Sequence, residues 1–568
     1  MKGSQIIIET LIEQGVDAVF GYPGGYVLDI FDELYKARDR IKQYLTCHEQ
    51  GAAHAADGYA RASGKTGVVI ATSGPGATNL VTGIATAYMD SIPMIAITGN
   101  VAVPNLGRDS FQEIDIAGVT MPVTKHNYIV KNIAELADTI REAFFIAQNG
   151  RKGPVLIDIP KDIQQMDYPF QMTNDKGQIT NRDMSTHNAQ RTTHNEGQIS
   201  NNDNNFQLGK AADLVNAADR PVIYYGGGVI SAGASTELIA FAEKIDCPAA
   251  STVMGLGGFP ASHPLFLGMI GMHGHAGVTK ALLECDLIIA LGTRFSDRVA
   301  GDRKHFYPQA KIIHIDIDNA ELDKNVASTV SVNADLKTAL PALTDKITVV
   351  KRFDWRKRCN DLLAAHPPRE SREIVSPQRI LKTLNALHNG IVATDVGQHQ
   401  MWTAQTYRFT RPRQFITSGG LGTMGFGLGA SIGAAAVTGR RVALVTGDGS
   451  FHMNMNELVT AAAYNLPVTI LVFNNNVLGM VYQWQRLFYG KRFSSTILNR
   501  PTDYMKLAAA LGAKGFTIRD NNEIESVLKK ALSVKGPSLV NCIIGAEEAV
   551  MPMIPAGKNA AALILDID

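Results

Sequence analysis

The stretch that decides the fold is residues 442–476, VALVTGDGSFHMNMNELVTAAAYNLPVTILVFNNN. Its two apolar runs, 442–445 and 468–473, are too short for helices, so each predicts a buried strand. Between them, residues 456–464 are good helix formers, and Pro467 follows the end of that helix. A connection of this length makes a right-handed crossover between parallel strands, so both strands end at the same edge of the sheet.

Two polar side chains follow these strands and are predicted to meet at that edge. Asp448 lies in a Gly-Asp-Gly turn after the first strand, and Asn475 lies in an Asn triplet after the second. Oxygen ligands of this kind suit a hard divalent cation, and Mg²⁺ usually bridges phosphate oxygens instead of occupying an all-protein cage. Gly-Asp-Gly alone is usually only a tight turn. With this spacing, however, the pair resembles the pattern of enzymes that bind thiamine diphosphate through Mg²⁺.

The composition is that of an ordinary soluble enzyme. The 568 residues are 45% hydrophobic and 19% charged, enough for about three or four domains that each bury a core. A formal net charge of +1, without any block of like charge, provides no field for nucleic acid or for an anionic membrane. We therefore expect no nucleic-acid partner and no membrane association.

The cysteines and the N-terminal residues indicate a cytoplasmic protein. The five cysteines are scattered without CxxC spacing, which indicates neither a disulfide framework nor a zinc site. Glu9 and Glu13 interrupt the first apolar residues, which excludes a signal-peptide core. No uninterrupted apolar stretch approaches the length of a membrane span.

Alternating strand and helix patterns predict an α/β protein with three doubly wound parallel-sheet domains. The stretch 166–205, rich in Asn, Gln, Thr and Asp and without an apolar period, predicts a flexible, exposed linker. The predicted organisation is an N-terminal domain (1–165), the linker (166–205), a central domain (206–345), a helical connector (346–376), a C-terminal domain (377–548) and a C-terminal arm (549–568).

The first and third domains look like distant copies of each other. Residues 72–100 read TSGPGATNLVTGIATAYMDSIPMIAITGN, with the same order of turn glycines, helix, proline and apolar strand as the stretch that follows Thr446. Pro75 stands in the place of Asp448, so only the third domain can hold the metal. Any two βα units look somewhat alike; the functional interpretation is that a cofactor lies between the two copies.

Glu49 is the predicted catalytic acid of the first domain. It follows a short predicted strand and opens a predicted helix, where an acid can equally be a partner of the helix dipole. The segment HEQGAAHAADGYARASGK, however, resembles the one that carries the glutamate of thiamine diphosphate enzymes. By that resemblance Glu49 hydrogen-bonds N1′ of the aminopyrimidine and favours the imino tautomer, so that the cofactor can remove its own C2 proton.

At this point the chain resembles one family, the catalytic subunit of acetohydroxyacid synthase, or acetolactate synthase, of the biosynthetic type that contains FAD. The resemblance covers nearly the whole chain except the linker. Its supporting segments are GYPGG from Gly21, FQE from Phe111, GPVLIDIPKD from Gly153, GMIGMHG from Gly268, RFSDR from Arg294 and QWQRLFYGKRFSS from Gln483.

The resemblance implies decarboxylation of pyruvate on thiamine diphosphate and transfer of the hydroxyethyl unit to a second 2-keto acid. A second pyruvate gives 2-acetolactate and 2-ketobutyrate gives 2-aceto-2-hydroxybutyrate, at the first common step of valine, leucine and isoleucine biosynthesis. Such chemistry needs Mg²⁺ on the diphosphate, a site that excludes water, and a fixed cation for the carboxylate of the acceptor.

The resemblance also assigns the residues around the cofactor and its metal. The metal ligands would be the side chains of Asp448 and Asn475 and the backbone carbonyl of Val477. Met424 would wedge the cofactor into its bent form, although a methionine there is otherwise an ordinary core filler. The predicted contacts of thiamine diphosphate are Tyr22, Pro23, Glu49, Val396, Gly397, Gln398, His399, Gly422, Met424, Gly447, Gly449, Ser450, Gly479 and Met480.

The predicted reacting residues come from the same resemblance. Besides Glu49, the catalytic set is Gly25, Gln112 and Lys161, and the substrate set is Phe111, Met272, Arg298 and Trp484. Arg298 would bind the acceptor carboxylate, but it can equally be a surface ion-pair partner. Trp484 would contact the ethyl group of 2-ketobutyrate, but its segment can equally be a packed helix face. Residues 481–494 would form a lid that excludes water.

The central domain is predicted to bind FAD in a structural, non-redox role. A predicted strand at 222–225 leads into a glycine triplet, which can hold phosphates at a helix N-terminus. A bare triplet also occurs in turns that bind nothing, and the flavin assignment rests on the resemblance. The predicted FAD contacts are Gly226, Gly227, Gly228, Met272, His273, Gly292, Arg294, Asp316 and Asp335.

Three positions depart from the family pattern: Gly429 where proline is common, Asn100 where glutamine is common, and Ser296 where an aspartate often stands. Two other functions stay open, a pyruvate oxidase in which the flavin takes the electrons, and a non-enzymatic scaffold, which should have lost Glu49 or Asp448. The resemblance further implies a homodimer or homotetramer, with each site built across two subunits, and a possible small regulatory subunit.

Overall fold

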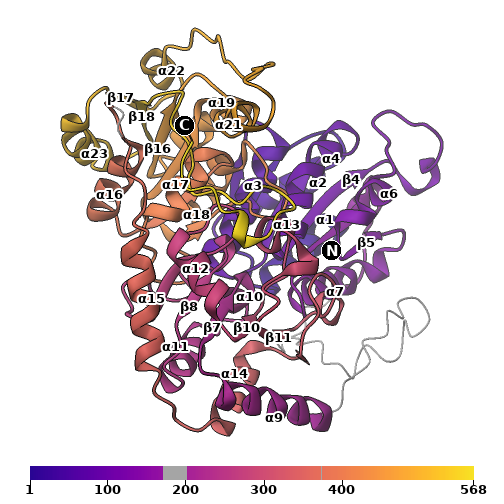
Figure 1. Ribbon diagram of the computed structural model, residues 1–568. Coiled ribbons are helices and arrows are strands. Elements are labelled where there is room, and N and C mark those ends of the chain that lie inside the picture. Colours follow the sequence, from indigo (N-terminus) through magenta and orange to yellow (C-terminus); the bar gives the residue numbers. More distant parts are fainter. Residues whose placement is uncertain (171–200, 372–373, 568) are drawn as a thin grey trace.

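The computed structural model describes residues 1–170, 201–371 and 374–567. Within them the chain forms three six-stranded sheets, every neighbouring pair of strands is parallel, and helices pack on both faces (Figure 1). The predicted fold class is therefore confirmed. None of the helices in the described ranges has the length and apolar composition that a membrane span requires.

The N-terminal sheet has the strand order β2-β1-β3-β4-β6-β5. Strands β3, β4 and β6 are buried along their whole length, as expected for a parallel sheet covered on both faces. The strands are β1 (Ala18–Tyr22), β2 (Lys42–Leu45), β3 (Gly67–Ala71), β4 (Met94–Asn100), β5 (His126–Ile129) and β6 (Pro154–Pro160), and the α-helices are α1 (Gly3–Glu13), α2 (Leu28–Lys36), α3 (Glu49–Ser63), α4 (Pro75–Asn79), α5 (Val81–Met89), α6 (Ile116–Thr120), α7 (Leu136–Gln148) and α8 (Lys161–Gln165).

The central sheet has the order β12-β11-β10-β7-β8-β9. Its strands are β7 (Pro221–Tyr225), β8 (Ala249–Ser251), β9 (Phe266–Met269), β10 (Leu287–Leu291), β11 (Lys311–Asp316) and β12 (Val330–Asn333), and its α-helices are α9 (Asn201–Ala217), α10 (Gly227–Ser231), α11 (Ser235–Lys244), α12 (Ala276–Glu284), α13 (Asp297–Ala300) and α14 (Leu336–Lys346), followed by α15 (Phe353–Ala365).

The C-terminal sheet has the order β14-β13-β15-β16-β18-β17, which is the order of the N-terminal sheet strand for strand. The internal similarity in the sequence therefore reflects a shared topology. The strands are β13 (Ile391–Thr394), β14 (Phe415–Ile416), β15 (Val442–Gly447), β16 (Val468–Asn474), β17 (Lys514–Ile518) and β18 (Ser538–Ile543), and the α-helices are α16 (Pro377–Leu387), α17 (Gln398–Thr406), α18 (Phe426–Thr438), α19 (Asp448–Asn454), α20 (Glu457–Ala463), α21 (Gly479–Phe488), α22 (Tyr504–Ala510) and α23 (Ile524–Leu532).

The deciding stretch folds as strand, helices and parallel strand, with one difference from the prediction. Strands β15 and β16 pair in parallel, with Gly447 opposite Phe473. In the Gly-Asp-Gly segment, however, Gly447 is the last residue of β15, and Asp448 and Gly449 are the first residues of helix α19. Pro75 likewise opens α4 after β3, so it occupies the place that Asp448 occupies in the other copy.

The C-terminal end of the predicted linker differs from the prediction. Helix α9 begins at Asn201, so residues 201–205 belong to a helix and not to the predicted linker; residues 171–200 of that linker lie outside the described residues. Helix α15 lies within the predicted helical connector. Beyond β18 the chain returns across the middle of the molecule near α13 (Figure 1), where Asp302 N donates to Lys558 O at 3.2 Å.

The N- and C-terminal domains pack through equivalent helices, α3 and α18. Glycines allow the two backbones to approach closely: a Cβ at Gly58 would lie 2.0 Å from Ala430 O, and one at Gly433 would lie 1.8 Å from Ala55 O. The apolar core continues across this contact. The two copies are thus held face to face within one chain.

Candidate active site

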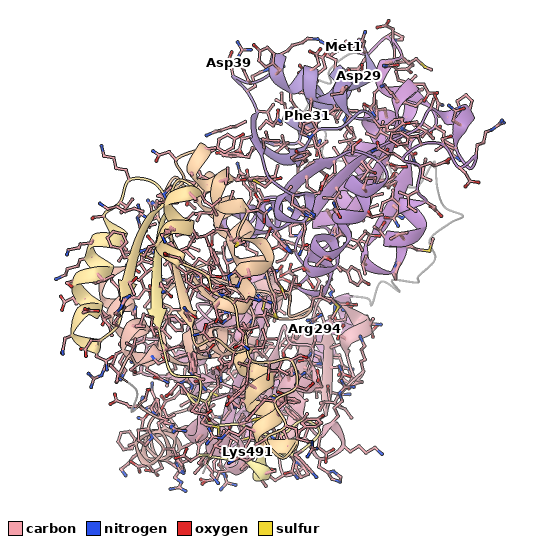
Figure 2. The ribbon with its side chains drawn as sticks, turned by 90° about the horizontal axis from the view of Figure 1, so that it is seen from above. Met1, Asp29, Phe31, Asp39, Arg294 and Lys491 are labelled. Carbon is pink, nitrogen blue, oxygen red and sulfur yellow. The ribbon has the colours of Figure 1, made fainter. Side chains whose placement is uncertain are left out.

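A cavity of about 1620 Å³ lies where the three domains meet. The N-terminal domain, the glycine turns of the central domain and the carboxyl ends of β13, β15 and β16 all contribute to its wall. Figure 2 shows Arg294, which lines the cavity, near the border between the N-terminal domain and the rest of the molecule. Clefts at the carboxyl ends of parallel strands are the usual ligand sites of such folds.

One end of the cavity holds the predicted metal ligands. Asp448 is buried; its Oδ1 accepts from Gly449 N at 2.9 Å and its Oδ2 from Asn476 N at 2.8 Å. Burial raises the pKa of this carboxyl to about 6. Asn475 Oδ1 accepts from Val477 N at 3.2 Å. These oxygen donors fit a hard cation such as Mg²⁺, with positions left for water and phosphate oxygens.

In the described part of the chain, no three His, Cys, Asp or Glu side chains form a group that could hold a metal ion. The predicted site is of a different kind, because it combines one carboxylate with a side-chain amide and a backbone carbonyl. A cation held this way depends on further ligands, which a diphosphate would supply.

The wall beside the predicted metal ligands fits a diphosphate. Helices α17 and α21 both begin there, and helix N-termini attract anions. A Cβ at Gly479 would lie 2.0 Å from Gln398 Oε1, and one at Gly447 would lie 3.0 Å from His399 Nδ1, so this wall has no room for larger residues. His399 is buried, burial lowers its pKa to about 3, and its Nε2 has no hydrogen-bond partner among the described residues.

The other end of the cavity fits an extended nucleotide. A Cβ at Gly228 would lie 2.6 Å from Gly292 Cα, so only glycine allows the turns after β7 and β10 to approach each other this closely in the wall. Asp316, at the end of β11, is buried, and burial raises the pKa of its carboxyl to about 6. Every residue of the predicted FAD set lines the cavity.

The predicted substrate residues of the central and C-terminal domains lie together. The guanidinium of Arg298 lies over the Trp484 ring, 5.5 Å from its centroid, and Arg298 Nη1 is 3.7 Å from Met272 Sδ. Asp297 is 3.7 Å from Arg298 Nε, yet 57% of the Arg298 side chain is exposed. The ion pair of the alternative interpretation is therefore present, and it leaves more than half of the Arg298 side chain accessible to an anion.

The predicted residues of the N-terminal domain do not reach this cavity. Its wall contains every predicted cofactor, metal and substrate residue of the other two domains, and none of Tyr22, Pro23, Gly25, Glu49, Phe111, Gln112 and Lys161. The predicted site is therefore divided into two halves in one chain.

The N-terminal residues instead form a half-site of their own. Lys161 Nζ donates to Gly25 O at 3.0 Å, and Tyr26 Oη donates to Phe111 O at 2.9 Å. Gln112 has φ of 60°, in the left-handed region that non-glycine residues adopt rarely. Phe111 is 80% exposed.

Glu49 is the first residue of α3, as predicted, and belongs to the same half-site. Its Oε2 accepts from Asn79 Nδ2 at 3.0 Å, and its Oε1 lies 3.2 Å from where a Cβ at Gly76 would be. Its carboxylate is thus fixed at one edge of the N-terminal sheet, facing a position that Gly76 keeps open.

Comparison with known proteins gives the family. The chain matches three models in order: the N-terminal TPP binding domain of thiamine pyrophosphate enzymes over residues 1–119, their central domain over 208–343, and their C-terminal TPP binding domain over 395–542. It is 45% identical to a probable acetolactate synthase large subunit of Methanocaldococcus jannaschii, covering 100% of this chain and 96% of that protein. The chain belongs to the acetolactate synthase large-subunit family of thiamine pyrophosphate enzymes.

Further members of this family match equally completely. The chain is 43% identical to acetolactate synthase isozyme 2 large subunit of Escherichia coli, over 99% of each protein, and 42% identical to acetolactate synthase of Arthrospira platensis, over 98% and 97%. The recognition made from the motifs is thereby confirmed. As in other thiamine pyrophosphate enzymes, the N- and C-terminal domains are both TPP-binding domains, and here each carries one half of the predicted site.

Asp395, at the start of the segment 395–400 that resembles the family's cofactor-contacting loop, accepts from Thr446 Oγ1 at 2.7 Å and from Gly427 N at 2.8 Å. It does not line the cavity itself, and it connects the end of β13 to β15 and α18.

Some residues of the cavity wall were not predicted as part of the site. Arg61 and Asp90 line the cavity from the N-terminal domain. An Asp-x-x-x-Arg pair in an Ala-rich, buried helix was the available signal for Arg61; no local pattern indicates Asp90.

Proposed function

We propose that this protein is the catalytic large subunit of an acetolactate synthase. It would join the two-carbon unit of pyruvate to a second pyruvate or to 2-ketobutyrate. One observation carries the proposal: Asp448, Asn475, Arg298 and Trp484 all line the same cavity. The cofactor that carries the two-carbon unit and the cation that binds the acceptor carboxylate would then share one cavity.

The cofactors would be thiamine diphosphate, Mg²⁺ and FAD. Asp448, Asn475 and the carbonyl of Val477 would hold the metal, and the glycine-lined wall beside His399 would hold the diphosphate. Bound thiamine diphosphate supplies the electron sink that decarboxylation of a 2-keto acid requires. FAD would occupy the end of the cavity at Gly228 and Asp316 without taking electrons, because the overall reaction is redox-neutral.

The residues have separate tasks in this proposal. Glu49 holds a proton shared with the aminopyrimidine ring, Arg298 binds the carboxylate of the acceptor through its two-pronged cation, and Trp484 contacts the alkyl group of the acceptor. Gly25, Phe111, Gln112 and Lys161 border the reacting carbons from the N-terminal half-site. The segment 481–494 excludes water when it closes.

We propose further that a second copy of the chain completes each site. The residues of the N-terminal half-site do not line the chain's own cavity, and Phe111 among them is 80% exposed, so Glu49 would act on a cofactor held by another subunit. A twofold dimer would complete two sites at once. A homodimer is therefore the minimum active unit; a homotetramer and a small regulatory subunit are compatible with it, since curated relatives are named as large subunits.

We also propose a cytoplasmic location. All five cysteines are free thiols in the structure, and four of them are buried. Burial raises the pKa of the thiols at Cys247, Cys285, Cys359 and Cys542, so these residues stay protonated and inert, as suits packing in a reducing compartment.

One incubation tests the proposed reaction. The protein, pyruvate, thiamine diphosphate and Mg²⁺ are combined with and without added FAD, and acetolactate, acetate and acetyl phosphate are measured. We expect acetolactate as the main product, formed without consumption of oxygen. Acetate or acetyl phosphate with reduction of the flavin would indicate a pyruvate oxidase instead.

A further inference from the structure

A buried charged cluster of the N-terminal domain contacts the glycine-rich loop that leads to Met424. Its members are Asp57, Arg61 and Asp90, whose side chains are 0%, 6% and 0% exposed. Arg61 pairs with Asp57 four residues before it on α3, and its Nη2 lies 2.9 Å from Asp90 Oδ2. One cation thus lies between two buried carboxylates. The excess negative charge requires further hydrogen-bond donors to stabilise it.

Those further donors come from the loop 417–424 of the C-terminal domain. Gly420 N donates to Asp90 Oδ1 at 2.6 Å, and Gly419 N donates to Asp90 Oδ2 at 3.1 Å. Arg61 Nη1 donates to Thr417 O at 2.8 Å. The loop forms neither helix nor strand, so its backbone groups depend on side-chain partners such as these.

Two other contacts limit the position of the same loop. Thr86, on α5 one turn before Asp90, makes a 2.7 Å hydrogen bond between its hydroxyl and that of Thr423. Met254 of the central domain packs against Gly419: a Cβ at Gly419 would lie 2.3 Å from Met254 Sδ. The loop is therefore held between the N-terminal and central domains, and its residues 418–422 and 424 line the cavity.

We propose that Asp90 is a positioning residue: its carboxylate fixes the loop 417–424, and through it Gly422 and Met424, in the arrangement that the bent cofactor needs. This inference rests on the proposed function. Among the described residues, the carboxylate of Asp90 hydrogen-bonds the loop backbone and Arg61 and has no hydrogen bond to a predicted metal ligand. Loss of its charge should therefore change the shape of the bound cofactor and leave the diphosphate anchor in place.

The decisive variant is Asp90→Asn, because the amide replaces one acceptor oxygen by a donor that opposes the N–H groups of Gly419 and Gly420. The matched control is Asp57→Asn, which removes the other carboxylate of Arg61 without touching the loop. In the cofactor-free protein, amide hydrogen exchange of peptides covering 417–424 should be about tenfold faster in Asp90→Asn and within about twofold of wild type in Asp57→Asn.

The loaded protein gives a second readout. Exchange of the C2 proton of bound thiamine diphosphate, followed by NMR, should slow by about tenfold in Asp90→Asn, while the Kd of thiamine diphosphate with Mg²⁺ changes by less than about threefold. Wild-type amide exchange in the loop, or equal effects of the two substitutions, would overturn the proposal. If the wild-type protein itself shows no C2 exchange, the proposed function fails, and the amide measurement still decides the role of Asp90.

A second variant keeps the test decidable if Asp90→Asn does not fold. Gly420→Ala leaves every charge in place, but its Cβ would lie 2.8 Å from Asp90 Oδ1 and 2.8 Å from Met89 O, so the loop must move away from Asp90. The same faster amide exchange and slower C2 exchange are expected. Wild-type behaviour of a folded Gly420→Ala protein would contradict the proposal.

Discussion

At the scale of single residues, the account depends first on Asp448, whose carboxylate is the only charged member of the predicted metal set. Asp448→Ala should weaken Mg²⁺-dependent binding of thiamine diphosphate by at least about 10–100-fold, the loss typical even of residues that only support a ligand. The fold should survive, because among the described residues the side chain accepts hydrogen bonds only from the backbone N–H groups of Gly449 and Asn476. Isothermal titration measures the affinity.

The control for this substitution is Asp138→Ala, on the surface of α7, where the side chain is 81% exposed. It should leave cofactor affinity unchanged. Unchanged affinity in Asp448→Ala as well would remove the metal assignment.

Glu49 is tested through proton exchange instead of binding. Glu49→Gln keeps the shape of the side chain and loses the acid, so thiamine diphosphate should still bind while exchange of its C2 proton slows by a factor on the order of 10²–10⁴. NMR of quenched samples gives the rate. A variant that exchanges this proton as fast as wild type would show that Glu49 has no part in the step.

Trp484 is expected to set the choice of acceptor. Its ring lies beside Arg298 and Met272, so the ethyl group of 2-ketobutyrate would gain an apolar contact that the methyl group of pyruvate barely reaches. One methylene in such a pocket is worth roughly 1–3 kcal/mol, or about 10–200-fold. Trp484→Leu should therefore erase most of the preference for 2-ketobutyrate in a competition between the two keto acids and still form acetolactate. Arg298→Ala should impair use of both acceptors.

The outcome of that competition is read from the ratio of the two products. Arg298→Ala serves as the comparison, since it lowers both products without changing their ratio greatly. An unaltered ratio in Trp484→Leu would mean that specificity resides elsewhere in the cavity.

At the scale of elements, the contact between α3 and α18 fixes the relation of the two TPP-binding domains. Gly433→Ala places a Cβ 1.8 Å from Ala55 O, which must force the helices apart. Overpacking of this kind costs about 1–3 kcal/mol, so the free energy of unfolding should fall by that amount in urea. Gly209→Ala on α9, where a Cβ meets nothing within 4 Å, is the control and should be neutral or slightly stabilising. Equal stability of both variants would contradict this packing.

Local sequence patterns were sufficient for the elements around the metal. Residues 442–445, 468–473 and 456–464 were predicted as strand, strand and helix, and the structure has β15, β16 and α20 there. Helix α19 was missed because its glycine and asparagine residues are poor helix formers; the helix forms at the end of β15, where Asp448 accepts from Gly449 N. The start of helix α9 was missed in a similar way, because it lies in an Asn-rich stretch with low helix propensity. Packing of the later residues of α9 overrides that propensity.

The site was predicted less completely than the elements, because its contacts are long-range. Motifs indicated Asp448, Asn475 and Glu49, but nothing local states that Asp90 reaches the backbone of Gly419 and Gly420, more than three hundred residues away. A motif also does not predict whether a residue contacts the cofactor bound by its own chain or the cofactor bound by a second subunit. That property follows only from the geometry of the whole chain.

At the scale of the whole molecule, the separation of the two half-sites is the main finding. The cavity contains all the predicted residues of the central and C-terminal domains and none of those of the N-terminal domain. Tyr22 and Phe111 of the N-terminal half-site are exposed, and a second subunit that completed the site would cover them. We therefore expect no activity from a monomer.

Mixed dimers test this central claim most directly. Glu49→Gln and Asp448→Ala chains, each nearly inactive alone, are coexpressed with different affinity tags, and the doubly tagged dimer is purified. If each site combines Glu49 of one subunit with Asp448 of the other, one of its two sites is fully wild type, and acetolactate formation should recover to about half of the wild-type rate per dimer. If both residues acted within one chain, every site would carry a lesion, and a mixed dimer no more active than its parents would contradict the account.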